Sequence, residues 1–331
     1  MTMINRRDAI AFGTAAAAGI FAPSIGRAAN VTLRISTPDS ATHPNHAILT
    51  KFANLLEQRS AGSVKVRIFP DGQLGTIANA LTGLQTGTID MAVNGASMSE
   101  GIVPELGVLG LPFMFPDEKS AERVIDGDVG KMLTGKLSEK GIEVLAWSSW
   151  GWRVTQTSNR AIRAPKDFQG LKIRLPAGPV FADTFATLGA IPTVVDSTEL
   201  YLAVSQGTVD GFEVPFLSLV ASKWYEVVKY VSLTNHAYNP VWLAMSKRRL
   251  NGLAPEQAKI IRDTARELQP EWRTHVAEKS LESEKFIKDR GIEVIPVDVS
   301  AFRALLTPVY DRFKQKVGVE LVDRVLREAK A

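Results

Sequence analysis

The stretch "GLKIRLPAG", Gly170–Gly178, lies near the middle of the 331-residue chain and shows the pattern that decides the fold. Three apolar residues alternate with Lys172 and Arg174, as in a strand with one buried face. Pro176 and the following glycine then end the strand. Arg174 therefore stands at a strand end, where its guanidinium either keeps an exposed face soluble or binds something that arrives from outside.

Strands of this kind recur along the chain and alternate with helical segments. Further strands are predicted at 31–37, 64–69, 89–95, 142–147 and 230–236. Strands separated by helices predict an α/β fold with a largely parallel sheet. The length and the 45% hydrophobic content suit two domains.

One motif that occurs twice predicts how these elements are grouped. "LQTGTIDMAV" (84–93) and "VSQGTVDGFEV" (204–214) both run from a helix end through Gly-Thr and an Asp into a strand. Gly87 and Gly207 are expected to end their helices in the left-handed conformation. A motif that recurs once at domain-scale spacing predicts two similar lobes, with coincidence as the alternative.

A long helical segment follows, from Glu256 to Arg290. At about 1.5 Å of rise per residue it is longer than one lobe is wide, so we expect it to bridge both. Pro270 is expected to kink or split it. Further helical segments are predicted at 301–316 and 319–329.

The first residues predict an export signal. Arg6 and Arg7 precede an apolar run from Ala9 to Ala22, too short to span a bilayer, and small residues follow it. Residues 1–28 therefore read as a twin-arginine-like signal peptide, and we expect a periplasmic protein.

The composition excludes several kinds of chemistry. Basic and acidic residues nearly balance, 39 against 35, so no nucleic-acid partner is expected. The absence of cysteine removes disulfides and thiol chemistry. His43 and His46 in "HPNH" are expected to cap the next helix and not to bind a metal, and the chain carries none of the common catalytic or nucleotide-binding motifs. We expect no cofactor, no metal and no enzymatic activity.

Aromatic residues and arginines gather near predicted strand ends. "WSSWGWR" places Trp150, Trp152 and Arg153 close together, and Phe212, Glu213 and Trp242 follow later. Ligands of open α/β sheets bind beyond the carboxyl ends of the strands, where Arg174 also stands. Arginine suits a carboxylate because its rigid fork makes two parallel hydrogen bonds.

These stretches, taken together, resemble the solute-binding proteins of tripartite ATP-independent periplasmic (TRAP) transporters, of the DctP type. The resemblance runs from about Val31 to the C-terminus and is carried by "FPDGQLG" (69–75), "LPFMF" (111–115), "GWR" (151–153), "APKDFQGLKIRLP" (164–176) and "VDGFEVP" (209–215). It implies a two-lobed periplasmic binding protein fold of type II-like character, with crossover strands and a helix that spans both lobes. The implied lobes are 30–151 plus 240–279, and 152–239 plus 280–331.

The resemblance also implies a site and partners. Arg174 matches the arginine that clamps the substrate carboxylate in that family, and Arg153 matches a second arginine near the ligand. The predicted ligand-binding set is Arg174, Arg153, Trp150, Glu213, Phe212, Val214, Asn94, Gln73, Phe113, His43, Asn235 and Trp242. The implied partners are a small organic acid and the membrane permease subunits, and we expect a monomer. An exported enzyme or a sensor subunit on the same scaffold is the alternative.

One departure from the family bears on the ligand. Val214 stands where the family commonly has asparagine, so an apolar branch replaces an amide. With Trp150, Trp152, Phe212 and Trp242 as a candidate apolar wall, we expect an aromatic or branched 2-oxo or 2-hydroxy acid in preference to a C4-dicarboxylate or a sugar acid.

The export signal gives a first prediction. We expect the mature protein to begin near Ala29 or Asn30, because small residues precede that point. Mass spectrometry of protein isolated from the periplasm measures this directly. Intact Met1 in that compartment would contradict it.

Overall fold

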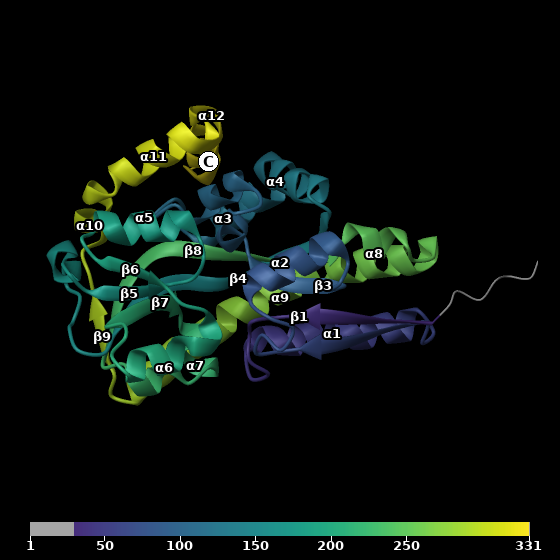
Figure 1. Ribbon diagram of the computed structural model, residues 1–331, viewed down its shortest axis with the longest axis horizontal. Helices are drawn as coiled ribbons and strands as arrows, with labels where there is room; N and C mark the ends of the chain where they lie inside the picture. Colours follow the sequence, from purple (N-terminus) through teal and green to yellow (C-terminus); the bar gives the residue numbers. More distant parts are fainter. Residues whose placement is uncertain (1–29, 331) are drawn as a thin grey trace, which may run out of the picture.

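The computed structural model describes residues 30–330, and the predicted signal peptide lies outside them (Figure 1). Nine strands form one sheet in the described part of the chain. They are β1 (Val31–Ser36), β2 (Val64–Phe69), β3 (Met91–Gly95), β4 (Ile142–Thr157), β5 (Lys172–Leu175), β6 (Ile191–Val194), β7 (Gly211–Pro215), β8 (Tyr230–Ser246) and β9 (Glu293–Pro296).

The strand order has an internal symmetry: from each edge inward, the second, first and third strands of one half are followed by a central strand. The order is β2-β1-β3-β8-β4-β7-β5-β6, with β9 alongside β8. β1 pairs in parallel with β2 and β3, and β5 pairs in parallel with β6 and β7. The two central strands are antiparallel to each other and to their neighbours β3 and β7. The parallel order predicted from the sequence therefore holds within each half but not at the join.

The two central strands belong to both halves of the molecule. Figure 1 shows β4 and β8 running between one half with β1, β3 and α1 and another with β5, β6 and β7. Both strands are about ten residues longer than the sequence predicted. Their pairing shifts register between Ser149 and Trp152 and again after Arg153, and these irregularities break the period-two pattern on which strand prediction depends.

The motif that occurs at 84–93 and again at 204–214 makes equivalent hydrogen bonds in the two halves. The Asp90 carboxylate accepts from the backbone N–H of Arg34 at 3.0 Å, and the Asp210 carboxylate accepts from that of Lys172 at 2.8 Å. Gly87 and Gly207 both adopt left-handed conformations, with φ of 82° and 71°. The prediction of two similar lobes is confirmed, because each aspartate ties the strand it begins to the neighbouring strand.

Helices cover both faces of the sheet. They are α1 (Pro44–Arg59), α2 (Ile77–Thr86), α3 (Glu118–Asp126), α4 (Asp128–Glu139), α5 (Pro179–Thr187), α6 (Leu200–Ser205), α7 (Phe216–Ala221), α8 (Lys247–Asn251), α9 (Pro255–Asp289), α10 (Val299–Leu305), α11 (Thr307–Val317) and α12 (Val319–Lys330). Short 3₁₀ turns lie at 97–99, 104–110, 165–168, 197–199 and 224–227. The segment 301–316, predicted as helical, is two helices, because Pro308 sits in the first turn of α11 and starts a new one.

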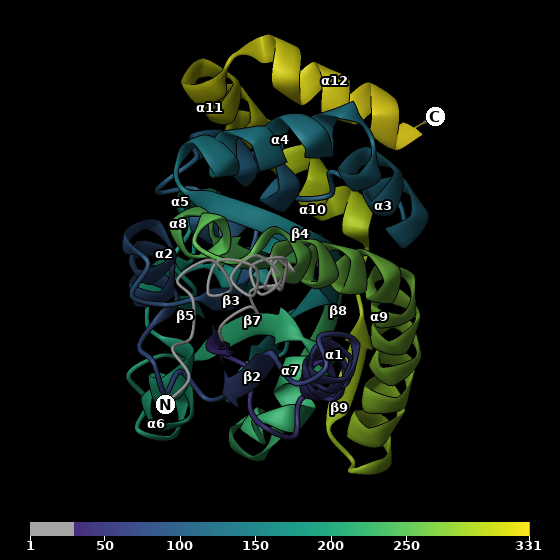
Figure 2. The ribbon, with the colours of Figure 1, turned by 90° about the vertical axis from the view of Figure 1, so that its right-hand side faces the viewer.

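The long helix α9 packs against both halves of the molecule. It contacts α1 in one half, and α7 and β9 in the other, with β4 between them. The helix continues through Pro270 without a break, so of the two effects predicted for this proline, a kink or a split, the split does not occur. Figure 2 shows α9 changing direction along its length beside α1, as a proline inside a helix would cause.

This architecture predicts closure around a ligand. The halves are joined by two irregular strands and one helix, so we expect them to hinge, and a ligand that touches both to favour the closed form. Small-angle scattering should show a smaller radius of gyration at saturating ligand than without ligand. An identical scattering profile under both conditions would count against a hinge.

Candidate ligand-binding site

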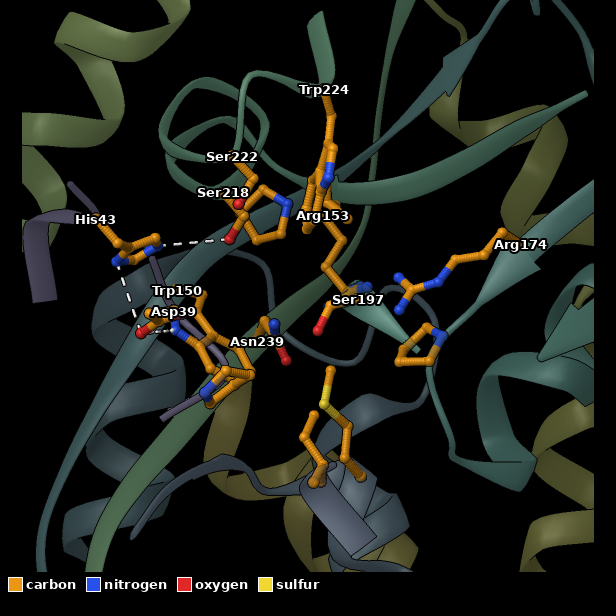
Figure 3. Close-up of a pocket in the computed structure, with 16 residues that line it drawn as sticks. Asp39, His43, Trp150, Arg153, Arg174, Ser197, Ser218, Ser222, Trp224 and Asn239 are labelled. Atoms are coloured by element: carbon orange, nitrogen blue, oxygen red, sulfur yellow. Dashed lines mark hydrogen bonds and ion pairs between the residues drawn. The ribbon is translucent and has the colours of Figure 1, made fainter. Parts of the chain in front are cut away.

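A pocket lies where the two halves meet, beyond the carboxyl ends of strands from both. Figure 3 shows its lining side chains converging from the connections that follow β1, β5, β6 and β7 and from the middle of β4 and β8. One half contributes Pro38, Asp39, His43, Ile77, Met98 and Trp150, and the other contributes Arg153, Arg174, Pro176, Ser197, Val214, Pro215, Ser218, Ser222, Trp224 and, near the middle of β8, Asn239.

A buried ion pair forms the floor of the pocket. Thr155 on β4 lies directly opposite Glu213 on β7, which makes Arg153 the diagonal neighbour of Glu213 on the same face of the sheet. The Nε of Arg153 donates to Glu213 Oε2, and its Nη2 donates to Oε1 at 2.7 Å and to the Glu213 carbonyl at 2.6 Å. Both side chains are at most 2% exposed. Arg153 also lies over the ring of Phe181.

His236 completes the surroundings of this carboxylate. Its Nε2 lies 3.1 Å from Glu213 Oε2, and its Nδ1 lies 2.9 Å from the Thr234 hydroxyl. Burial alone would raise the pKa of Glu213, but Arg153 and His236 outweigh it and hold that pKa below its usual value. The carboxylate therefore stays ionised and balances the charge of Arg153.

Arg174 is buried without such a partner. It lies on β5 and is 3% exposed, and its Nε donates to the Val195 carbonyl at 2.7 Å. Within residues 30–330, no hydrogen bond or ion pair engages its two η nitrogens, and Figure 3 shows them pointing into the pocket. Burial lowers the pKa of Arg174 to about 10, which still leaves it charged at neutral pH. The pocket therefore holds one positive charge that no acidic side chain pairs with directly.

The opposite side of the pocket carries Asp39, His43 and Trp150. The Nε1 of Trp150 donates to Asp39 Oδ2 at 3.0 Å. His43 caps α1, as its Nδ1 accepts from the backbone N–H of Asn45 at 3.2 Å, which confirms the helix-capping prediction for "HPNH". Burial lowers the pKa of His43, so the ring is neutral at neutral pH.

Hydrogen bonds across the pocket hold the two halves together. The hydroxyls of Ser40 and Thr42, after β1, donate to the Ala221 carbonyl at the end of α7, at 3.3 and 3.0 Å. The Nε2 of His43 lies 3.4 Å from the Ser218 hydroxyl at the start of α7. These contacts, with both arginines almost fully buried, describe a closed pocket.

Comparison with known proteins identifies the family. The sequence model of the bacterial extracellular solute-binding proteins, family 7 (DctP), matches residues 35–316. The chain belongs to this family. The resemblance to DctP-type solute-binding proteins of TRAP transporters, given by the motifs of the sequence, is confirmed.

Relatives and solved structures agree with this assignment over almost the whole chain. The 2,3-diketo-L-gulonate-binding periplasmic protein YiaO of Escherichia coli K12 is 35% identical over 312 residues, covering 93% of this chain and 95% of that protein. The sugar acid binding protein DctPAm of Advenella mimigardefordensis, solved with galactonate, has a TM-score of 0.89 at 30% identity and covers 91% of this chain and 98% of that one. A TRAP solute-binding protein of Bordetella bronchiseptica, with density assigned to pantoate, has a TM-score of 0.86 at 31% identity and covers 90% of this chain and 99% of that one. The two-lobed periplasmic binding fold is thereby confirmed.

The structure brings five of the residues predicted for this DctP-type protein to the pocket wall. They are Arg174, Arg153, Trp150, Val214 and His43. Glu213 lies behind Arg153 and reaches the pocket only through it. Their role in binding stays a prediction.

The other six predicted residues do not line this pocket. Phe212 is fully buried and packs against Trp224, with the ring centroids 6.0 Å apart. Trp242 and Asn94 are fully buried at paired positions of β8 and β3. Gln73 is exposed in the turn after β2. Phe113 and Asn235 line a separate depression near α10, and both have positive φ, 57° and 41°.

The apolar wall predicted from four aromatic residues does not form. Only Trp150 of that group lines the pocket, since Trp152 packs against Tyr238 at 5.3 Å and the other two are core residues. Apolar lining comes instead from Met98, Ile77 and Trp224, together with prolines.

Sequence reasoning missed most of the polar lining. Ser197, Ser218, Ser222, Asp39 and Asn239 were not singled out. Asp39 and Ser197 follow the carboxyl ends of β1 and β6, so the position rule for α/β sheets was the signal that could have found them. Asn239 lies inside a long strand and carries no such signal. In the part of the chain that the structure describes, no group of three or more His, Asp or Glu side chains is arranged to hold a metal ion.

The Arg153–Glu213 pair gives a prediction on stability. Glu213→Gln should lower the free energy of unfolding by about 3 kcal/mol or more at pH 7, because it leaves a buried guanidinium without its counter-charge. Because the pKa of Glu213 is lowered by folding, the stabilisation is present above the unfolded pKa of about 4.3 and is lost as the pH falls through the folded value. Urea unfolding measures this: the difference in free energy of unfolding between the native protein and Glu213→Gln should be smaller in acid than at pH 7.

Glu271→Gln is the matched control for this measurement. Glu271 pairs with Lys51, and both side chains are about half exposed, so its loss should cost less than about 1 kcal/mol. Equal stabilities of the two variants at pH 7 would refute the prediction.

Proposed function

We propose that this protein is the periplasmic solute-binding component of a TRAP transporter, which captures a small organic acid in the pocket and delivers it to membrane permease subunits. The observation that carries the proposal is the buried Arg174, whose η nitrogens face the pocket without a protein partner. A second buried arginine, Arg153, already has its carboxylate in Glu213. The pocket thus offers hydrogen-bond donors and one positive charge to an anionic group.

A carboxylate fits this place better than other groups. The guanidinium fork offers two parallel N–H donors, which match the two oxygens of a carboxylate. In a buried pocket the ion pair is screened little by solvent, so the interaction is stronger than on the surface. A neutral sugar would leave the buried charge of Arg174 unpaired, which selects for acids.

The rest of the proposed mechanism follows from the fold. The ligand would touch Arg174 in one half and Trp150 in the other, and so favour the closed form. We assign the lobes as 30–151 plus 240–279 and 152–239 plus 280–331. Within residues 30–330, no helix combines the length and apolar character needed to cross a bilayer. We propose that separate permease subunits take up the released ligand, and that the binding protein acts as a monomer.

We propose binding without chemical turnover. Two titratable groups that could serve as acid or base are engaged by the protein: Glu213 by Arg153 and His236, and His43 as the cap of a helix. The named relatives support this, since galactonate is described as bound to the Advenella protein and pantoate is assigned in the Bordetella protein. Recovery of an acid unchanged after prolonged incubation would agree with binding alone.

Arg174 provides the test of this function. Arg174→Ala should weaken binding of the acid by about a hundredfold or more, because one partner of a buried ion pair is lost. Arg174→Lys should recover little, because an ammonium lacks the fork. Isothermal titration calorimetry, with an acid found by a thermal-shift screen of carboxylic acids, measures both.

Arg163→Ala is the control, since Arg163 is an exposed arginine that pairs with Glu293 away from the pocket. It should leave the dissociation constant unchanged. Near-native affinity of the Arg174→Ala variant would remove the basis for the proposed function.

A further inference from the structure

Asp39 places a carboxylate in a pocket that is built for an anion. It is 7% exposed, and its Oδ2 accepts from Trp150 Nε1 at 3.0 Å and from Asn45 Nδ2 at 3.1 Å. Its Oδ1 has no hydrogen-bond partner in residues 30–330. Figure 3 shows Asp39 on the opposite side of the pocket from Arg174. The two ends of the pocket therefore differ in charge.

His43 does not neutralise this carboxylate. Its Nδ1 lies 3.6 Å from Asp39 Oδ2, but the same nitrogen accepts a hydrogen bond from the Asn45 backbone, which requires it to carry no proton. Burial also lowers the pKa of the ring. His43 is the only basic side chain within ion-pair distance of Asp39 among the described residues. This end of the pocket carries a net negative charge at neutral pH.

Asn239 lies in the pocket between the two ends. It is 1% exposed, and neither its amide nitrogen nor its amide oxygen has a hydrogen-bond partner in the described chain. An amide buried without partners costs free energy, so its donor and acceptor are available to a ligand. Asn239 supplies an uncharged pair of hydrogen-bonding atoms on the path from Arg174 to Asp39.

We propose that Asp39, with Asn239, forms a subsite for a ligand hydroxyl, so that the ligand is a hydroxylated monocarboxylic acid and dicarboxylic acids are rejected. This rests on the proposed function, in which Arg174 holds the single carboxylate. A hydroxyl donates to the free Oδ1 of Asp39 and can exchange hydrogen bonds with the Asn239 amide. A second carboxylate has no proton to donate, and its charge would face that of Asp39 in a buried space where water screens little.

Matched acids that differ only at the far end test the subsite. The pairs are pantoate and 3,3-dimethylmalate, D-erythronate and meso-tartrate, and D-galactonate and galactarate, in each of which a terminal CH₂OH becomes a carboxylate. By calorimetry at pH 7, we expect the hydroxy acid of every pair that binds to have at least a tenfold lower dissociation constant. A dicarboxylate that binds as tightly as its partner, or more tightly, would overturn the proposal.

Asp39→Asn isolates the charge. The variant keeps an amide oxygen that accepts the hydrogen bonds from Trp150 and Asn45. It should reduce the ratio of the two dissociation constants, dicarboxylate over hydroxy acid, by tenfold or more in each pair. Asp71→Asn is the control, because Asp71 is an exposed acidic residue that lines a neighbouring depression and not the pocket itself; it should leave the ratio of the two dissociation constants unchanged. An unchanged ratio in Asp39→Asn would also overturn the proposal. If that variant does not fold, the native protein gives the test with pantoate and 2-hydroxy-3,3-dimethylbutanoate, which lacks the terminal hydroxyl. Equal dissociation constants for these two acids would refute the subsite.

Arg174→Ala separates this proposal from the one beneath it. If all acids lose affinity in Arg174→Ala while dicarboxylates bind best in the native protein, the carboxylate clamp stands and the hydroxyl subsite fails. If Arg174→Ala changes nothing, the proposed function fails whatever the ratios are. Binding of none of the six acids would overturn the hydroxyl subsite alone, because the proposed function is tested with any acid that the thermal-shift screen finds.

Discussion

The buried ion pair between Arg153 and Glu213 is the interaction on which the binding site depends. Two arginines lie in one closed pocket, and each disfavours the charge of the other. Glu213, held by Arg153 on one side and His236 on the other, supplies the negative charge that lets both arginines stay buried. Because that carboxylate forms its ion pair with Arg153, Arg174 is the arginine whose charge has no acidic partner in direct contact. The pair thus leaves the guanidinium of Arg174 as the charge that is available to the anion of the proposed function.

The two long central strands place this site between the lobes. β4 carries Trp150 and Arg153 across the join, and β8 carries Asn239 beside them. The remaining lining comes from connections at the carboxyl ends of strands in both halves, which the palindromic order of the sheet brings face to face. The site is therefore complete only when the lobes approach each other. Binding and closure are then one event, as capture followed by release to a membrane partner requires.

The residue types that gather near the pocket were easier to predict from the sequence than the side to which each side chain points. Arg174 was found because a short strand with a clear period of two, followed by Pro176, fixes where its last residues lie. Phe212 and Val214 differ by two positions on one strand, yet one packs into the core against Trp224 while the other meets the pocket. No local pattern separates them, because each placement depends on which helix covers that part of the sheet. Trp152 and Trp242 were misplaced for the same reason.

The sequence by itself determined the fold class, the two similar lobes, the bridging helix and the arginine at the strand end, because these follow from periodicity, turn residues and family motifs within short windows. Only the tertiary structure decided which arginine is free. Arg153 and Glu213 lie 60 positions apart, and their pairing depends on the register of β4 against β7. Likewise, Asp39 and Arg174 lie in different lobes and become the two ends of one pocket only where the lobes meet. Such contacts join residues that are distant along the chain, so their charge balance is a property of the assembled sheet and not of any segment.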